Sequence, residues 1–185
     1  MIDPEPAWLA TFITIPKVST DIWATNFANW VEPHVVSAEL TGVIAASDPF
    51  TFNKAVFETA LKLLGPESTA IAGIQGFADA WETAILASTL VVSAGDSLGA
   101  PSPPTIWSVV AASIIDPPSI LLGKAKILEL VSSAKVPDAS DSDFPKIFRA
   151  AFLLLTGTVT GLDSQLPPPA GPGPQPLVAS SVPLI

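Results

Sequence analysis

The sequence predicts a mainly α-helical fold, made of a compact helical domain with an extended N-terminal arm and a proline-rich C-terminal strap. Two observations lead to this prediction. Hydrophobic residues recur at helical spacing in several segments, which begin at capping residues and end at glycine or proline. Seven of the 20 prolines follow Asp163, where no ionisable side chain occurs. We therefore divide the chain into an arm at residues 1–19, a helical domain at residues 20–163 and an extended segment at residues 164–185.

Five helices are expected in the domain, each with a hydrophobic stripe or a capping signal. They are predicted at residues 20–31, 51–64, 68–90, 119–134 and 144–156. Pro33 is expected to stop the first helix, and Gly65 with Pro66 to end the second.

Other segments are less decisive. Residues 4–16 fit a short helix or an extended arm, and residues 105–115 fit a buried helix or a strand, because periodicity does not separate the two. The stretch Gly157–Gly161 is interpreted as a helix end and a turn. We find no internal repeat and no series of alternating strands.

The composition indicates a surface that faces another macromolecule. Hydrophobic residues make up 49% of the 185 residues and charged residues 14%, whereas an ordinary soluble domain has about 25% charged residues. The net charge of −9 argues against nucleic acid and against anionic membranes as partners. The sequence has no Cys, which excludes disulfides and thiolate metal sites. A soluble chain without an export signal or a membrane anchor is expected.

No group of residues predicts catalysis, a cofactor or a metal. His34, the only histidine, is expected to be a capping or surface group rather than a general base. Asp79 and Glu82 share a helix face and are expected to be solvated. The acidic stretch at residues 138–143 fails the calcium-loop pattern, because residue 12 of such a loop would be Arg149 instead of Glu.

The candidate functional residues are therefore interface residues. Trp23, Phe27 and Trp30 follow one helix face, which favours core packing or a subunit contact over a ligand site. The apolar residues near the C-terminus are expected to be buried against protein, either on the same chain or on a neighbouring subunit. The full set of interface candidates is Trp8, Trp23, Phe27, Trp30, Leu177, Val178, Val182, Leu184 and Ile185.

The closing segment "LTGTVTGLDSQLPPPAGPGPQPL", which follows a charge-poor helical body, resembles small virion proteins of tailed bacteriophages. The resemblance covers residues 155–185 and carries no functional residue over. It implies a structural subunit of a virion (capsid, neck, tail or baseplate) that contacts other protein subunits and is assembled in the host cytoplasm. Two alternatives remain open: a helical binding module with a pocket for an apolar small molecule, and an enzyme that uses scattered Ser, Asp or His34 groups.

Overall fold

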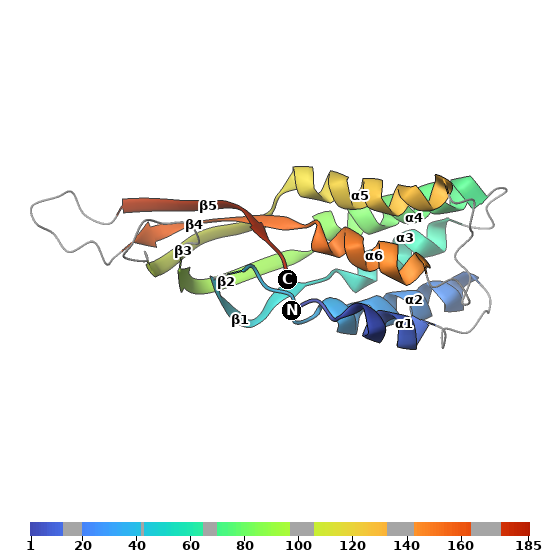
Figure 1. Cartoon of the computed structure of the whole chain (residues 1–185), viewed down its shortest axis with the longest axis horizontal. Helices are drawn as coiled ribbons and strands as arrows, with labels where there is room; N and C mark the ends of the chain where they lie inside the picture. The colour runs from blue at the N-terminus through green and yellow to red at the C-terminus, as the bar shows by residue number, and fades with distance from the viewer. Residues whose placement is uncertain (13–19, 42, 65–69, 97–105, 133–142, 164–174) are drawn as a thin grey trace, which may run out of the picture.

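The computed structural model describes residues 1–12, 20–41, 43–64, 70–96, 106–132, 143–163 and 175–185. Within these residues the chain forms six helices and a five-stranded antiparallel sheet. The molecule is elongated, with the helices gathered at one end and the strands at the other (Figure 1). The prediction of a mainly helical chain with a compact helical domain is confirmed, and a small sheet is added to it.

The five expected helices are all present, and a sixth precedes them. The helices are α1 (Glu5–Phe12), α2 (Thr20–Val35), α3 (Lys54–Leu63), α4 (Ala70–Leu86), α5 (Pro117–Ser132) and α6 (Asp143–Leu153). Within the expected N-terminal arm, residues 5–12 are helical, and α1 buries Trp8 and Phe12 in the core. Pro33 lies inside α2 and does not stop it. A proline removes one backbone donor, and the burial of Val35 against the core holds the last turn in place.

The strands are the part of the fold that the sequence did not predict. They are β1 (Val43–Thr51), β2 (Thr89–Asp96), β3 (Ile106–Ile115), β4 (Thr156–Asp163) and β5 (Gln175–Pro183), paired in that order. The ambiguous segment at residues 105–115 forms β3. The interpretation of Gly157–Gly161 as a helix end and turn was wrong, because these residues belong to β4 and pair with both neighbouring strands. Their alternating threonine and valine side chains favour an extended backbone.

The order of the elements contains a repeat. A pair of helices followed by an extended stretch occurs three times. We call each helix pair with its following stretch a unit: the N-terminal unit (residues 5–40), the central unit (54–96) and the C-terminal unit (117–163). The second helix and its exit correspond without a gap at residues 27–40, 77–90 and 144–157. Ten of these fourteen positions have the same burial class in all three units.

The same backbone bond ends the second helix in every unit. The amides of Ala38, Ser88 and Leu155 each donate to the carbonyl oxygen three residues earlier, at 3.0 Å in all three cases. This tight last turn redirects the chain from the helix into the extended stretch. The three units are therefore local copies of one structure.

Equivalent residues of the three units meet in the core. The rings of Phe27, Phe77 and Phe144 contact one another, with centroid distances of 5.0, 5.2 and 5.5 Å. Each of these side chains is at least 97% buried. The second helix of each unit therefore contributes one equivalent ring to a shared cluster in the core.

A second layer of equivalent residues lies where the helices meet the sheet. These residues are Leu40, Leu90 and Gly157. A Cβ atom on Gly157 would lie 2.8 Å from Leu40 Cδ2 and 3.0 Å from Leu90 Cδ2. The two leucines therefore fill the space that a side chain at position 157 would take, and glycine is the residue that fits there.

Both ends of the chain complete the N-terminal unit. In the other two units, the strand before the helix pair is antiparallel to the stretch after it, as in the pairs Thr51↔Thr89 and Ile115↔Gly157. Among the described residues, residues 1–4 ahead of α1 form no strand. The last residues of the chain take this place, because Leu184 pairs with Leu40.

Backbone hydrogen bonds hold this junction together. Ile185 and Glu39 exchange both hydrogen bonds of a ladder pair, at 2.9 and 3.0 Å. The N-terminal amine of Met1 donates to the carbonyl oxygen of Ser37, and the two termini lie close together in Figure 1. The described part of the strap is thus an integral strand, β5, that pairs with β4 along its whole length.

The burial of the C-terminal apolar residues follows from an irregularity in β5. Val182 and Leu184 are buried and Ile185 is partly buried, whereas Val178 is 66% exposed. Between Val178 and Val182 the register with β4 shifts, and Ser181 has a positive φ of 57°. An extra residue at such a bulge turns the following side chains to the other face of the strand. Val178 is therefore not buried by its own chain, so its expected burial would require a neighbouring subunit, and the side chain of Leu177 lies outside the described set.

Candidate interaction surface

The only histidine lies in a buried polar network rather than at the surface. His34 is 5% exposed, its Nδ1 lies 2.8 Å from Asp3 Oδ2, and its Nε2 lies 2.9 Å from the hydroxyl of Thr11. Trp8 stacks on the imidazole ring with a centroid distance of 4.8 Å. The expectation of a capping or surface histidine was wrong, because α2 continues past Pro33 and carries His34 into the core.

This carboxylate, imidazole and hydroxyl have the order of a catalytic triad, but their surroundings indicate a structural tie. The Thr11 hydroxyl accepts the indole N–H of Trp30 at 2.9 Å and lies 3.0 Å from the carbonyl oxygen of Ala7. A nucleophile also needs backbone donors that stabilise an oxyanion. Thr11 lies in the last turn of α1, where the backbone amides donate hydrogen bonds within the helix and do not point to an oxyanion.

The repeat shows what this network replaces. The positions equivalent to His34 are Ala84 and Ala151, both fully buried, so the fold does not itself require a histidine there. In the N-terminal unit, the strand that lies beside Leu40 comes from the far end of the chain and does not lead directly into the first helix. The polar network anchors residues 1–4 to α2: the Asp3 amide donates to the His34 carbonyl oxygen at 2.9 Å.

A second set of polar contacts joins successive units at equivalent positions. Glu32 on α2 binds Lys54 on α3, at 2.6 Å. Glu82 on α4, the equivalent of Glu32, binds Lys124 on α5, also at 2.6 Å. Arg149 takes the same position on α6 and donates from Nε to the Asp3 carbonyl oxygen at 2.7 Å. Each second helix is therefore tied to another helix or, in the case of α6, to the residues just ahead of α1.

The Glu82 contact also includes Asp79, so both carboxylates that were expected to be solvated engage one lysine. The hydrogen bonds that Lys124 donates to Asp79 and then to Glu82 raise its pKa above the ordinary value. The two carboxylates thus tie α4 to α5. Within the described residues, no three His, Asp or Glu side chains gather closely enough to hold a metal ion.

Most of the aromatic interface candidates belong to the core. Trp8, Phe27 and Trp30 are at least 94% buried by the chain's own packing, and Trp23 is partly buried with its ring 5.1 Å from that of Phe27. Of the two readings left open for the α2 stripe, core packing is thus the one that the structure shows. The surface for a partner must be formed by other residues.

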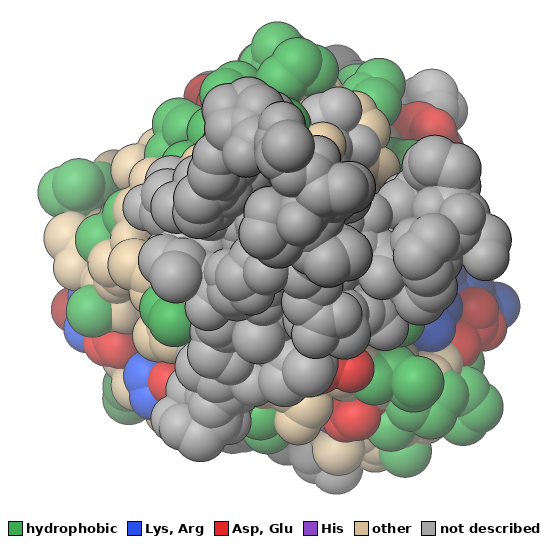
Figure 2. Space-filling view, turned by 90° about the vertical axis from the view of Figure 1, so that its left-hand side faces the viewer, with side chains coloured by type: hydrophobic (Ala, Val, Ile, Leu, Met, Phe, Trp, Pro, Cys, Tyr) green, Lys and Arg blue, Asp and Glu red, His purple; other side chains and the backbone are tan. Residues whose placement is uncertain are grey.

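Exposed apolar residues recur at one position of the repeat. Val36, Leu86 and Leu153 are equivalent and are 44%, 63% and 38% exposed. Each lies at or just past the end of its second helix, where the helices meet the sheet. Figure 2, which looks at the end occupied by the strands, shows hydrophobic side chains around the rim of the molecule among scattered charged ones.

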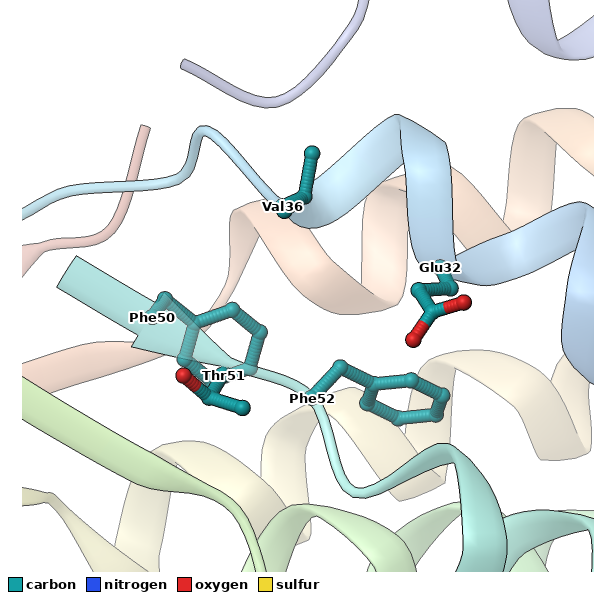
Figure 3. A pocket seen from close by; sticks show the side chains of 5 residues that line it. All are labelled: Glu32, Val36, Phe50, Thr51 and Phe52. Atoms are coloured by element: carbon teal, nitrogen blue, oxygen red, sulfur yellow. The ribbon is translucent and has the colours of Figure 1, made fainter. Parts of the chain in front are cut away.

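Two of these three positions line a depression in the surface. The first, which we call the Val36 notch, has a volume of about 170 Å³ and is lined by Glu32, Val36, Phe50, Thr51 and Phe52 (Figure 3). The second, the Leu86 notch, has a volume of about 420 Å³. Its lining residues come from the α4–β2 connection and the β3–α5 connection: Ile85, Leu86, Ser88, Thr89, Leu90, Val91, Ser113, Ile114, Ile115 and Ile120.

The two notches occupy equivalent boundaries. Each is formed by the end of a second helix and by the end of the strand that leads into the next helix pair. The third boundary lies beside Leu153, between α6 and β4 on one side and the two ends of the chain on the other. The Leu184 amide donates to the Leu155 carbonyl oxygen there, at 2.9 Å. The candidate interaction surface therefore lies around the junction between the helices and the sheet. We call this surface the waist, and its exposed apolar residues are Val36, Leu86 and Leu153.

No protein-family model, no curated protein and no solved structure matches the chain. In the described part of the chain, no helix combines the length and the apolar character needed to cross a membrane.

Proposed function

We propose that the chain is a structural subunit of a large protein assembly, and that this assembly is a bacteriophage virion. The observation that carries the proposal is the recurrence of exposed apolar side chains at Val36, Leu86 and Leu153. A chain with 14% charged residues has few polar groups to cover such positions, and apolar surface of this kind is typical of protein contacts.

The virion part of the proposal is supported by the resemblance of residues 155–185 to small virion proteins of tailed phages. The described end of that segment pairs with the chain's own β4, so in this proposal the waist makes the contacts with neighbouring subunits. The role needs no catalytic group, which agrees with a histidine that is engaged in holding the N-terminal segment.

The test is a triple substitution at the waist: Val36→Ser, Leu86→Ser and Leu153→Ser. The variant is expected to keep its helical circular dichroism, because these side chains are exposed, and to lose co-sedimentation with the phage particle. The matched control replaces three exposed apolar residues away from the waist, Ile22, Leu63 and Val178, with serine. Incorporation of the waist variant at the level of the unchanged protein would refute the proposal.

A further inference from the structure

We propose that Ser113 holds open the seam between β2 and β3, and that the two strands close into a continuous ladder when its hydroxyl is removed. Ser113 is thus a spacer built into the sheet. The inference concerns the conformation of the chain and does not depend on the proposed function. It follows from the extent of the ladders, from the register of the two strands and from the equivalent boundary at the C-terminus.

The seam between β2 and β3 is paired at the end of the sheet away from the helices. Among the described residues, the two strands share the ladder pairs Gly95↔Trp107 and Asp96↔Ile106. Each of the other three ladders continues to the helical end of its strands. The Leu86 notch lies along the stretch where the β2–β3 ladder is missing, because its walls include residues 89–91 of β2 and 113–115 of β3.

A side-chain hydrogen bond crosses this open stretch. The Ser113 hydroxyl donates to the Leu90 carbonyl oxygen at 2.6 Å. In an antiparallel ladder the donor to such a carbonyl oxygen is a backbone amide, and paired strands lie about 4.8 Å apart. Because the hydroxyl projects from the backbone of β3, a bond made through it leaves the two strands further apart than a ladder would.

The two strands are already in register for closure. Trp107 and Ser113 enclose five residues of β3, two of which lie outside the register with β4. Gly95 and Leu90 enclose four residues of β2, one of which lies outside the register with β1. Three residues remain on each strand, so a ladder that starts at Gly95↔Trp107 arrives with Leu90 opposite Ser113.

The backbone of β3 also presents the donors that closure needs. The Asp116 amide donates to the Thr156 carbonyl oxygen of the neighbouring chain segment, at 2.8 Å. Alternate residues of a strand turn their backbone groups to opposite sides. The amides of Ser113 and Ile115 therefore face β2, whereas that of Ile114 faces β4.

The third boundary shows the closed form of an equivalent seam. Val182 and Leu184 take the places of residues 113 and 115, because each strand end pairs with the exit of its own unit. Val182 pairs with Gly157, and the Leu184 amide donates to the Leu155 carbonyl oxygen at 2.9 Å. The ladder is continuous there, and the residue at the place of Ser113 has no hydroxyl.

Closure of the β2–β3 seam would give it the same bonds. The Ser113 amide would donate to the Leu90 carbonyl oxygen, and the Ile115 amide to that of Ser88, the equivalent of Leu155. In the described part of the chain the Ile115 amide and the Ser88 carbonyl oxygen form no such bond. Closure would also take up the space of the Leu86 notch, since the notch lies between the same two strands.

The experiment traps the closed seam with a disulfide. In the closed register Thr89 and Ile114 are a non-hydrogen-bonded pair, with a Cα separation of about 4.5 Å that suits a disulfide. Thr89→Cys and Ile114→Cys are introduced together into the Cys-free chain, with Ser113 retained, with Ser113→Ala or with Ser113→Thr. We expect the Ser113→Ala chain to oxidise at least about fivefold faster than the other two, because it gains backbone hydrogen bonds on closure. Equal rates in all three chains would overturn the inference.

Hydrogen exchange checks the same point without a disulfide. In the unchanged chain the Ile115 amide should exchange faster than the Ile114 amide, and equal protection of the two would overturn the inference without any variant. Ser113→Ala should slow exchange of the Ile115 amide at least about fivefold. The matched control is Thr59→Ala, which removes a hydroxyl bonded to the Ala55 carbonyl oxygen on α3 and should leave this amide unchanged. Faster exchange at Ile115 in Ser113→Ala would show that the hydroxyl closes the seam instead of holding it open.

Discussion

The ring centroids of Phe27 and Phe77 lie 5.0 Å apart with their planes at 89°, although 50 residues separate them in the chain. Each ring stands at the same place of its own helix pair, and Phe144 stands at that place in the third pair. Edge-to-face contacts of this kind favour the arrangement beyond the burial of the rings.

Gly123 is expected to resist even the smallest substitution. A Cβ atom at this position would lie 2.2 Å from Cη2 of Trp81 and 2.8 Å from the Ala151 carbonyl oxygen. In an open helix Gly→Ala stabilises by about 1 kcal/mol, but here overpacking should reverse the sign and cost about 1–3 kcal/mol. Urea unfolding of Gly123→Ala measures this, with Leu122→Ala on the exposed face as the control. A stabilised Gly123→Ala variant would show that α5 does not pack on Trp81 as described.

Ser181 is expected to be a site where glycine stabilises the protein. Its φ of 57° lies in the left-handed region, which costs a non-glycine residue about 1–2 kcal/mol. Ser181→Gly should recover part of this cost and raise the melting temperature, while Ser181→Val should lower it. Equal melting temperatures for both variants would argue against a bulge in β5.

Glu58 should contribute stability that depends on pH. Hydrogen bonds from Lys62 and then Thr25 lower the pKa of Glu58 below its ordinary value of 4.5. A lowered pKa in the folded state adds stability above pH 4.5 and loses it as the pH falls through the folded-state pKa. Glu58→Gln should therefore cost less than about 1 kcal/mol at pH 7, and the difference should shrink in acid. A difference that stays constant from pH 7 to pH 3 would contradict this assignment.

Replacement of His34 should affect stability and leave assembly intact. His34→Ala removes the partner of the Asp3 carboxylate and of the Thr11 hydroxyl, which should cost about 1–3 kcal/mol. The folded variant should still enter the particle, since His34 lies in the core. Thermal unfolding and co-sedimentation measure the two effects. A variant that keeps its fold and its place in the assembly but loses a measurable turnover would instead identify an enzyme.

The sequence predicted the helices better than the way in which they are combined. Helical periodicity and stop signals located α2 to α6, because these signals are local. The strands β2 and β4 were missed because they follow directly on helical stretches, with only two residues between Leu86 and Thr89 and between Leu153 and Thr156. The hydrophobic pattern runs through these junctions without a break.

The repeat and the waist were hidden for a different reason. The three units share burial and not residue identity: Val31, Trp81 and Phe148 are equivalent and all fully buried. The unequal offsets of 50 and 67 residues also prevent a single period from appearing. One sequence feature did indicate the repeat: Phe27, Phe77 and Phe144 occupy the same position when the three segments are aligned without gaps. The alignment becomes evident only once the structure shows that these three rings are in contact. The buried tryptophans were proposed as interface residues because apolar character alone does not distinguish core from contact surface.

The central feature of this fold is that the chain's own last residues pair with residues 39–41 of the N-terminal end. Because the sequence has no Cys, the pair Glu39→Cys and Ile185→Cys can be introduced alone and tested by mild oxidation. These residues form a hydrogen-bonded pair, with a Cα separation of about 5.5 Å that suits a disulfide. Glu39→Cys with Val178→Cys is the control, since Val178 lies on β5 seven residues before Ile185. We predict an intramolecular disulfide in a monomer for the first pair and free thiols for the control; free thiols or covalent dimers for the first pair would contradict the account.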